Sequence, residues 1–172
     1  MYICILCEGR EKMRKKIRLF FMAVMMIACM GAGAISVSAQ ENAEVVDGSR
    51  LTHELFAEEI AYPKLRGTYL NYGSGRITIT GNRTVMVTGD TIARQNVDSV
   101  KVTTHLQQLK NGSWVTIASY GPVTKSNTYY VSASRSYSVA GGYYYRMTGS
   151  HTVIENGVFE SASSSTDGIW VS

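Results

Sequence analysis

Apolar and polar side chains alternate with a period of two along most of the chain beyond residue 66. The clearest run is YVSASRSYSV, residues 130–139, in which four serines share one face and most of the apolar residues share the other. Successive side chains of a β-strand point to opposite faces, whereas an amphipathic helix repeats every 3.6 residues. The pattern therefore predicts antiparallel strands with one face in a core and the other in water.

Turn residues between these runs predict which positions pair. The segment Gly81-Asn82-Arg83 separates RITIT from TVMVT. A three-residue loop there would place Ile79 opposite Val85 and Ile77 opposite Val87. These two runs are therefore expected to form a hairpin.

Asn111-Gly112 is the strongest hairpin signal, because a type I′ turn needs positive φ at both central positions. This turn predicts that Leu109 pairs with Trp114 and that Leu106 faces Ile117. Leu106 is then expected in the core. Trp114 is expected on the opposite face, unless a bulge returns it to the core.

A third turn, Asn156-Gly157, predicts that Val153 pairs with Glu160 and His151 with Ala162. His151 and Glu160 would then be diagonal neighbours on one face, within reach of each other. A carboxylate beside an imidazole favours the charged form of each. We therefore expect the two side chains to meet and the pKa of His151 to rise above about 6.5.

Short strands with turn signals roughly every ten residues favour an all-β fold. We expect an immunoglobulin-like or fibronectin-III-like antiparallel sandwich of seven or eight strands, and a small barrel is the alternative. The sequence offers no cysteine pair for a true immunoglobulin domain, because its three cysteines all precede residue 30.

Residues 1–39 have the features of a secretory signal peptide: a basic segment after Met13, an apolar run over 19–35, and small side chains before Gln40. We expect Met13 to be the true start and cleavage to follow Ala39. Two alternatives stay open, namely lipidation at Cys29 and retention of the run as a membrane anchor.

Removal of this leader changes the composition. All three cysteines leave with it, and the remaining 133 residues carry eleven basic and eleven acidic side chains. The high overall pI therefore gives no reason to expect a nucleic-acid partner, and contact with a membrane is expected only through the leader. Because no disulfide can form in the remainder, its core must stabilise it.

The acidic residues are concentrated just after the leader. Residues 40–59 hold six acids and one arginine, while residues 60–172 hold ten basic and five acidic side chains. We expect residues 40–65 to be an acidic linker, too short for a stable helix of its own. Residues 66–172 are expected to be the β-domain.

Several segments of this domain resemble a known family. They are RGTYLNYGSGRITITGNRTVMVTGDTIA, LQQLKNGSWVTIASY, GGYYYRMTGSHTVIENGVFES and TDGIWVS. They look like the landmarks of a family of small exported proteins from Gram-positive gut bacteria, classed as a domain of unknown function. The resemblance implies a β-fold and a secreted address, and it implies no activity.

Catalytic chemistry has little support in the sequence. No Gly-x-Ser-x-Gly turn occurs, and His53, His105 and His151 are scattered without metal-ligand spacing. Glu155 and Glu160 flank one turn instead of facing each other across a cleft. We expect no enzyme, and we assign no catalytic residue, metal ligand or cofactor.

Aromatic side chains favour a binding module, because tyrosine and tryptophan stack on sugar rings and dominate protein hot spots. The chain has eleven tyrosines and two tryptophans, nearly all beyond the leader. The alternation turns Tyr144 and Arg146 away from the core, and Tyr130 is expected to be exposed as well. The candidate binding residues are Trp114, Tyr130, Tyr144, Arg146, His151 and Glu160.

Three functions remain open at this point. The first is a secreted binding or adhesive module, in the extracellular space or at the cell envelope, whose partner is a glycan or a surface protein. The second is a structural or assembly subunit, and the third and least favoured is a hydrolase. An exposed aromatic patch would favour the first, a long unpaired edge strand the second, and a polar cleft with a buried acid the third.

Overall fold

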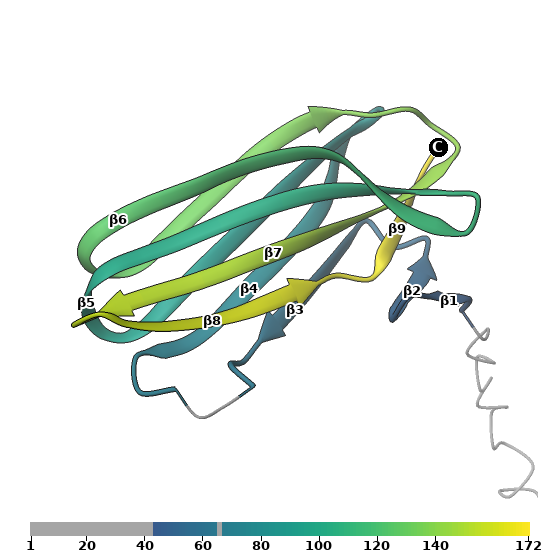
Figure 1. The fold of residues 1–172 in the computed structure, drawn as a ribbon. Coiled ribbons are helices and arrows are strands. Elements are labelled where there is room, and N and C mark those ends of the chain that lie inside the picture. Colours follow the sequence, from purple (N-terminus) through teal and green to yellow (C-terminus); the bar gives the residue numbers. More distant parts are fainter. Residues whose placement is uncertain (1–42, 65–66) are drawn as a thin grey trace, which may run out of the picture. The chain divides into compact units, whose positions relative to one another are not determined.

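Nine β-strands account for the regular structure of residues 43–64 and 67–172, the part of the chain that the computed structural model describes (Figure 1). The predicted leader lies outside these residues. Within them, no helix is long and apolar enough to cross a membrane. The strands are β1 (Val45–Val46), β2 (Ser49–Thr52), β3 (Phe56–Ala61), β4 (Leu70–Gly81), β5 (Thr84–Lys110), β6 (Ser113–Ser138), β7 (Tyr143–Glu155), β8 (Val158–Ser165) and β9 (Gly168–Val171).

All nine strands belong to one curled, open sheet. Its order is β1-β2-β9-β7-β5-β4-β3, with β6 added beside β5 and β8 beside β7. The all-β prediction is confirmed. An immunoglobulin-like or fibronectin-III-like sandwich divides its strands between two sheets, whereas strand pairing here is continuous through one.

A long hairpin of β5 and β6 runs through the whole sheet (Figure 1). The first part of β5 pairs with β4 and the second part with β7, while β6 pairs with the other edge of both parts. The pairing of β5 with β6 is interrupted between Ile92 and Val97. Beyond that interruption the β7–β8 half of the sheet lies against the β3–β4 half, and the core fills the space between them.

Two clusters of buried side chains form this core. One contains Leu70, Val97, Val100, Val102, Val131 and Val153, and the other contains Ile77, Val85, Val87, Leu106, Tyr145, Met147 and Ile169. These residues are the inward positions of the alternating runs, so the period of two in the sequence corresponds to the buried face of each strand.

The three predicted hairpins are present with nearly the predicted register. Ile77 pairs with Val87 and Ile79 with Val85 across the first turn. Across the others, the observed pairs are Leu109 with Trp114, His151 with Ala162, Val153 with Glu160 and Glu155 with Val158. Both Asn111 and Gly112 have positive φ, 51° and 76°, as the type I′ turn requires.

One pairing was wrongly predicted. Leu106 is buried as expected, but it lies opposite Ala118 instead of Ile117, because the register shifts by one residue in β6 between Thr116 and Ala118. This β-bulge leaves Ile117 41% exposed.

The segment 40–65, expected to be a linker, contributes three strands to the sheet. β1 pairs with β2, β2 pairs in parallel with β9, and β3 pairs with β4 over six residue pairs. The acidic residues misled the prediction because they lie on the exposed side or at the edge of these short strands. Glu58 is exposed, and Glu59 accepts a hydrogen bond from the backbone N–H of Ser165 in β8.

Candidate binding site

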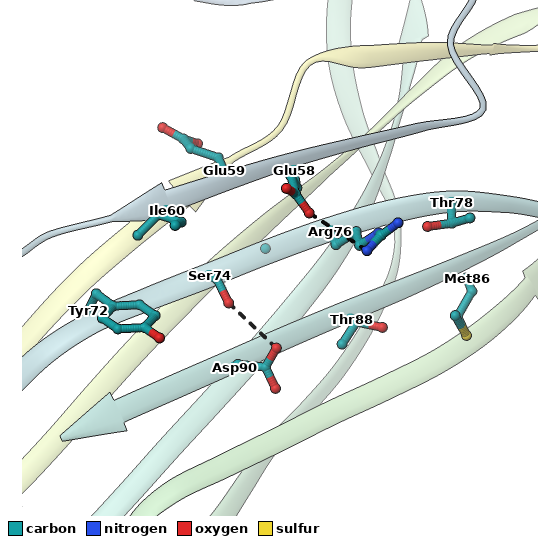
Figure 2. Close-up of a pocket in the computed structure, with 11 residues that line it drawn as sticks. Glu58, Glu59, Ile60, Tyr72, Ser74, Arg76, Thr78, Met86, Thr88 and Asp90 are labelled. Atoms are coloured by element: carbon teal, nitrogen blue, oxygen red, sulfur yellow. Dashed lines mark hydrogen bonds and ion pairs between the residues drawn. The ribbon is translucent and has the colours of Figure 1, made fainter.

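A groove crosses the outer face of β3, β4 and β5, on the side away from the core (Figure 2). Its volume is about 620 Å³, within the range of roughly 300–1,000 Å³ typical of small-ligand sites. Figure 2 shows three rows of side chains, one on each strand, that point to the same side of the sheet. The rows are Glu58 and Ile60 on β3; Tyr72, Ser74, Arg76 and Thr78 on β4; and Met86, Thr88 and Asp90 on β5.

Strand register aligns these side chains across the sheet. Glu58 pairs with Arg76, and Arg76 pairs with Thr88. Ser74 pairs with Asp90 in the next aligned set. Outward positions of neighbouring strands are therefore side by side, and the groove is a continuous surface of polar groups with apolar side chains between them.

Arg76 is held in position from two sides at one end of the groove. Its guanidinium carbon lies 4.5 Å from the ring centroid of Phe56, and Nη1 lies 3.7 Å from Oε2 of Glu58. A cation over an aromatic face and a carboxylate beside it both restrict the side chain. Half of the arginine side chain stays exposed, so its remaining donors face solvent.

Asp90 is the polar centre of the other end. Its Oδ1 accepts a hydrogen bond of 2.7 Å from the hydroxyl of Tyr130, and Ser74 donates a weaker one of 3.5 Å to Oδ2. Tyr72 lies nearby, with its ring centroid 6.2 Å from that of Tyr62. Tyr130, a predicted binding residue, thus lies beside the groove and is 38% exposed.

Trp114 and Arg146, both predicted to bind a ligand, instead hold the β1–β2 hairpin. The Arg146 guanidinium is 4.6 Å from the Trp114 ring, and its Nη1 donates to the Ser49 hydroxyl and to the Asp47 carbonyl. Trp114 Nε1 donates to the Val46 carbonyl at 3.0 Å. Arg146 is 6% exposed, and burial lowers its pKa, which the hydrogen bond with Asp47 opposes. Neither side chain has the exposure that a ligand platform needs.

Tyr144 belongs to a separate aromatic cluster at the end of β7. Its ring lies 4.9 Å from that of Trp170, and its hydroxyl is 3.2 Å from Nε2 of His53. A smaller hollow of about 280 Å³ adjoins His53 and Trp170 and includes Arg83. Tyr144 and Arg146 lie on the same side of β7, as the alternation predicted, but Arg146 is buried and the two do not form one site.

His151 and Glu160 were predicted to meet, and this was wrong although their strand register was right. His151 is fully buried, with Nδ1 3.0 Å from the Thr91 hydroxyl and Nε2 2.9 Å from the Ser164 hydroxyl. Thr91 donates its only proton to the Lys101 carbonyl, so Nδ1 carries the imidazole proton and Nε2 accepts from Ser164. The imidazole is neutral and satisfied.

The pKa of His151 therefore moves opposite to the prediction. Burial lowers it to about 4, because desolvation penalises the charged ring more than the nearby Asp90 favours it. The reason lies in the opposing half of the sheet. Gly73 of β4 leaves room there for the ring to turn inward, away from Glu160, and Gly149 leaves room beside the ring on β7 itself.

Glu160 joins β8 to the start of β4. Its carboxylate accepts hydrogen bonds from the backbone N–H groups of Thr68, Tyr69 and Leu70 at 2.6, 3.0 and 2.7 Å. Burial opposes the change, but these three donors lower the pKa of Glu160. The Glu160 carboxylate therefore links β8 to the start of β4, a contact that we call the seam between these strands. This structural role explains the position of Glu160 without a ligand.

Sequence reasoning missed most of the groove. The segment NYGSGRIT contained a usable signal, because its alternation turns Tyr72, Ser74 and Arg76 to the outer face. The contribution of β3 was hidden, since residues 40–65 were interpreted as a linker. Among the described residues, no group of three or more His, Cys, Asp or Glu side chains is arranged to hold a metal ion.

These observations define an all-β domain with an open, polar and partly aromatic groove on one outer face of its sheet. The chain belongs to a family of unknown function, DUF6147, whose family model matches residues 44–169. The match begins just before β1 and ends within β9, so the family includes the three strands formed by the segment that was expected to be a linker. Comparisons with curated proteins and with solved structures found no match.

Proposed function

We propose that this protein is an exported, non-catalytic binding module that holds its ligand in the groove of β3, β4 and β5. The observation that carries the proposal is the orientation of the groove side chains before any ligand arrives. Arg76 is held by Phe56 and Glu58, and Asp90 by Tyr130 and Ser74. Side chains that are ordered in advance lose less entropy on binding.

The state of the groove carboxylates supports binding over catalysis. Glu58 lies beside Arg76, Glu59 accepts the N–H of Ser165, and Asp90 accepts the hydroxyl of Tyr130. A general acid or base needs a carboxyl group that is free to exchange a proton with a substrate, and each of these three carboxylates already has a partner within the protein. The histidine with the strongly lowered pKa, His151, faces the core and not the groove.

The proposal that the protein is exported rests on the signal-peptide features of residues 1–39 and on the resemblance to exported proteins. Intact mass of the protein from a bacterial culture tests it. A species in the medium that begins at Gln40 supports the proposal. A species that begins at Cys29 and carries diacylglycerol would place the protein on the membrane face instead.

Binding is tested with the fluorescently labelled chain on a glycan array and on bacterial and host cell surfaces. The wild type is compared with a Tyr72→Ala/Arg76→Ala double variant and with Thr152→Ala, which changes β7 in the other half of the sheet. We expect the double variant to lose the signal and Thr152→Ala to retain it. Equal signals from all three proteins would show that the groove is not the site.

An assembly subunit is the second candidate, and the length of β6 favours it. The strand has 26 residues and pairs along one edge with β5, and within the described residues no strand pairs with its other edge. An open edge can receive a strand of another chain, although Pro122, Lys125 and Arg135 are residues of the kind that protect edges. Sedimentation velocity over a wide concentration range tests whether the chain assembles through the open edge of β6. A protein that stays monomeric at all concentrations does not assemble through this edge.

A further inference from the structure

The groove is longer along the strands than across them. Its lining on β4 extends from Tyr72 to Thr78, a distance of roughly 20 Å at about 3.4 Å per residue. Across the strands the lining covers β3, β4 and β5, about 10 Å in total at a strand spacing of about 4.8 Å. A ligand that fills the groove is therefore elongated and lies along β4.

The polar groups of the groove can serve a ligand rich in hydroxyls. Asp90 and Glu58 offer carboxylate oxygens that accept hydrogen bonds, and Arg76 offers guanidinium donors. Ser74 and Thr88 have hydroxyls, each of which can both donate and accept. Sugar hydroxyls also donate and accept, so such a ligand can bond all along the groove.

Tyrosine rings lie at the end of the groove that contains Asp90. Tyr72 lines one end of the groove, supported by Tyr62, and Tyr130 adjoins it beside Asp90. Tyr62 and Tyr130 are 67% and 38% exposed as whole residues, and Tyr72 is half-buried. An exposed ring of this kind can stack against the apolar face of a sugar, while its hydroxyl stays in water.

The charge of the groove selects against anions. Two carboxylates, Glu58 and Asp90, and one cation, Arg76, point into it, and Glu58 already partly neutralises Arg76 (Figure 2). An acidic polymer would bring further negative charge against these groups, and like charges that face each other across an interface disfavour binding. An uncharged polymer meets no such penalty.

We infer that the ligand is an uncharged glycan chain that lies along β4, with a sugar ring stacked on Tyr72 and hydroxyls bonded to Asp90 and Arg76. This inference rests on the proposed function, because it names the ligand class of the same groove. It excludes acidic glycans by charge. A basic peptide, which these carboxylates could attract, is the competing ligand class that the test includes.

Isothermal titration calorimetry on the purified full-length chain tests the inference. The probes are neutral pentasaccharides of the cello, xylo, manno, malto and chito series, an oligogalacturonate as the acidic glycan, and a lysine-rich peptide. We expect at least one neutral pentasaccharide to bind, with an affinity that changes less than two-fold between low and moderate salt. Tyr72→Ala and Asp90→Asn should each weaken binding about ten-fold, and Tyr144→Ala, outside the groove, should leave it unchanged.

The other outcomes separate the two proposals. If only the oligogalacturonate or the peptide binds, in a manner sensitive to salt and to Arg76→Ala or Asp90→Asn, the ligand class is wrong and the groove remains the site. If a neutral pentasaccharide binds but Tyr144→Ala alone abolishes it, the site is the aromatic cluster at the end of β7 and both proposals fail. If no probe binds, the glycan inference is overturned. Whether the groove is the binding site is then decided by the comparison of the wild type with the groove variant on the array and on cell surfaces. Circular dichroism of each variant confirms that loss of binding is not loss of fold.

Discussion

Gly73 of β4 lies directly against the imidazole of His151 in β7, since a Cβ atom added to Gly73 would stand 2.1 Å from Cγ of the histidine. No real Cβ contact is that short, so one of the two strands would have to move. The two halves of the sheet therefore approach each other here only because residue 73 has no side chain. We expect Gly73→Ala to destabilise the protein by about 1–3 kcal/mol or more, as measured by urea unfolding.

Gly81 provides the matched control on the same strand. A Cβ atom there would meet Thr84 at 3.9 Å, an ordinary contact, so Gly81→Ala should change the free energy of unfolding by less than about 0.5 kcal/mol. A Gly73→Ala/His151→Ala double variant should cost less than the two single changes added together, because the smaller residue 151 makes room for the methyl group. Strict additivity would mean that the two residues do not compete for space.

The buried imidazole makes stability depend on pH. The pKa of His151 is about 4 in the folded protein, against roughly 6.5 in an unfolded chain. Between these values the unfolded state binds the extra proton, so stability falls as pH drops from about 6.5 towards 4, with a slope of up to about 1.4 kcal/mol per pH unit. Unfolding measured across this range should show the slope in the wild type and lose most of it in His151→Gln.

His105→Gln serves as the control, because His105 lies on the outward side of β5, with Nδ1 2.7 Å from the Ser119 hydroxyl. It should keep the slope of the wild type. A His151→Gln protein whose stability has the same pH dependence as the wild type would show that the imidazole is not buried in its neutral form.

The local sequence predicted the hairpins correctly. It did not predict the side-chain orientation of His151, which depends on a strand distant in sequence. The Asn111-Gly112 and Asn156-Gly157 turns fix their own registers, because the turn residues require positive φ whatever surrounds them. The orientation of His151 depends instead on Gly73, in a strand far from it in sequence. No pattern in the β7–β8 hairpin reveals that space, so the register was right and the partner of His151 was wrong.

The groove was missed for a similar reason. FAEEIA in β3 does not alternate apolar and polar residues, because an edge strand with Glu58 and Ile60 on an exposed face needs no apolar stripe. Only pairing with β4 brings Glu58 beside Arg76. Trp114 was predicted to bind a ligand only because it is aromatic. Its actual partner, the β1–β2 hairpin, belongs to the segment that was expected to be a linker.

Glu160 should stabilise the seam between β8 and β4 through its charge. Glu160→Gln replaces a carboxylate that accepts three backbone N–H groups, and we expect a loss of about 1–3 kcal/mol at neutral pH by urea unfolding. Because the pKa of Glu160 is lowered on folding, its contribution is present above about pH 4.5 and disappears as pH falls through the folded value. The gap between the variant and the wild type should therefore close in acid.

Glu58→Gln, on the exposed face of β3, is the comparison and should cost less than about 1 kcal/mol. If Glu160→Gln were no more harmful than Glu58→Gln, the three hydrogen bonds would contribute nothing measurable to the seam.

Arg146 and Trp114 should act on the N-terminal hairpin and not on ligand binding. Arg146→Ala removes the donors to Asp47 and Ser49, and Trp114→Ala removes the donor to Val46. Hydrogen exchange at residues 45–52 should accelerate at least ten-fold in either variant, while residues of β4 and β5 keep their protection. Unchanged exchange at 45–52 would show that other contacts hold the hairpin.

The outer face of β3, β4 and β5 is the surface that we propose a ligand occupies. Amide chemical-shift mapping of the isotopically labelled chain, titrated with the neutral pentasaccharides, tests this directly. The largest shifts are expected along residues 72–78 of β4 and 86–90 of β5, the stretches whose outward residues line the groove. Shifts confined to His53, Tyr144 and Trp170 would contradict it, whereas no shifts at millimolar ligand would overturn only the glycan inference.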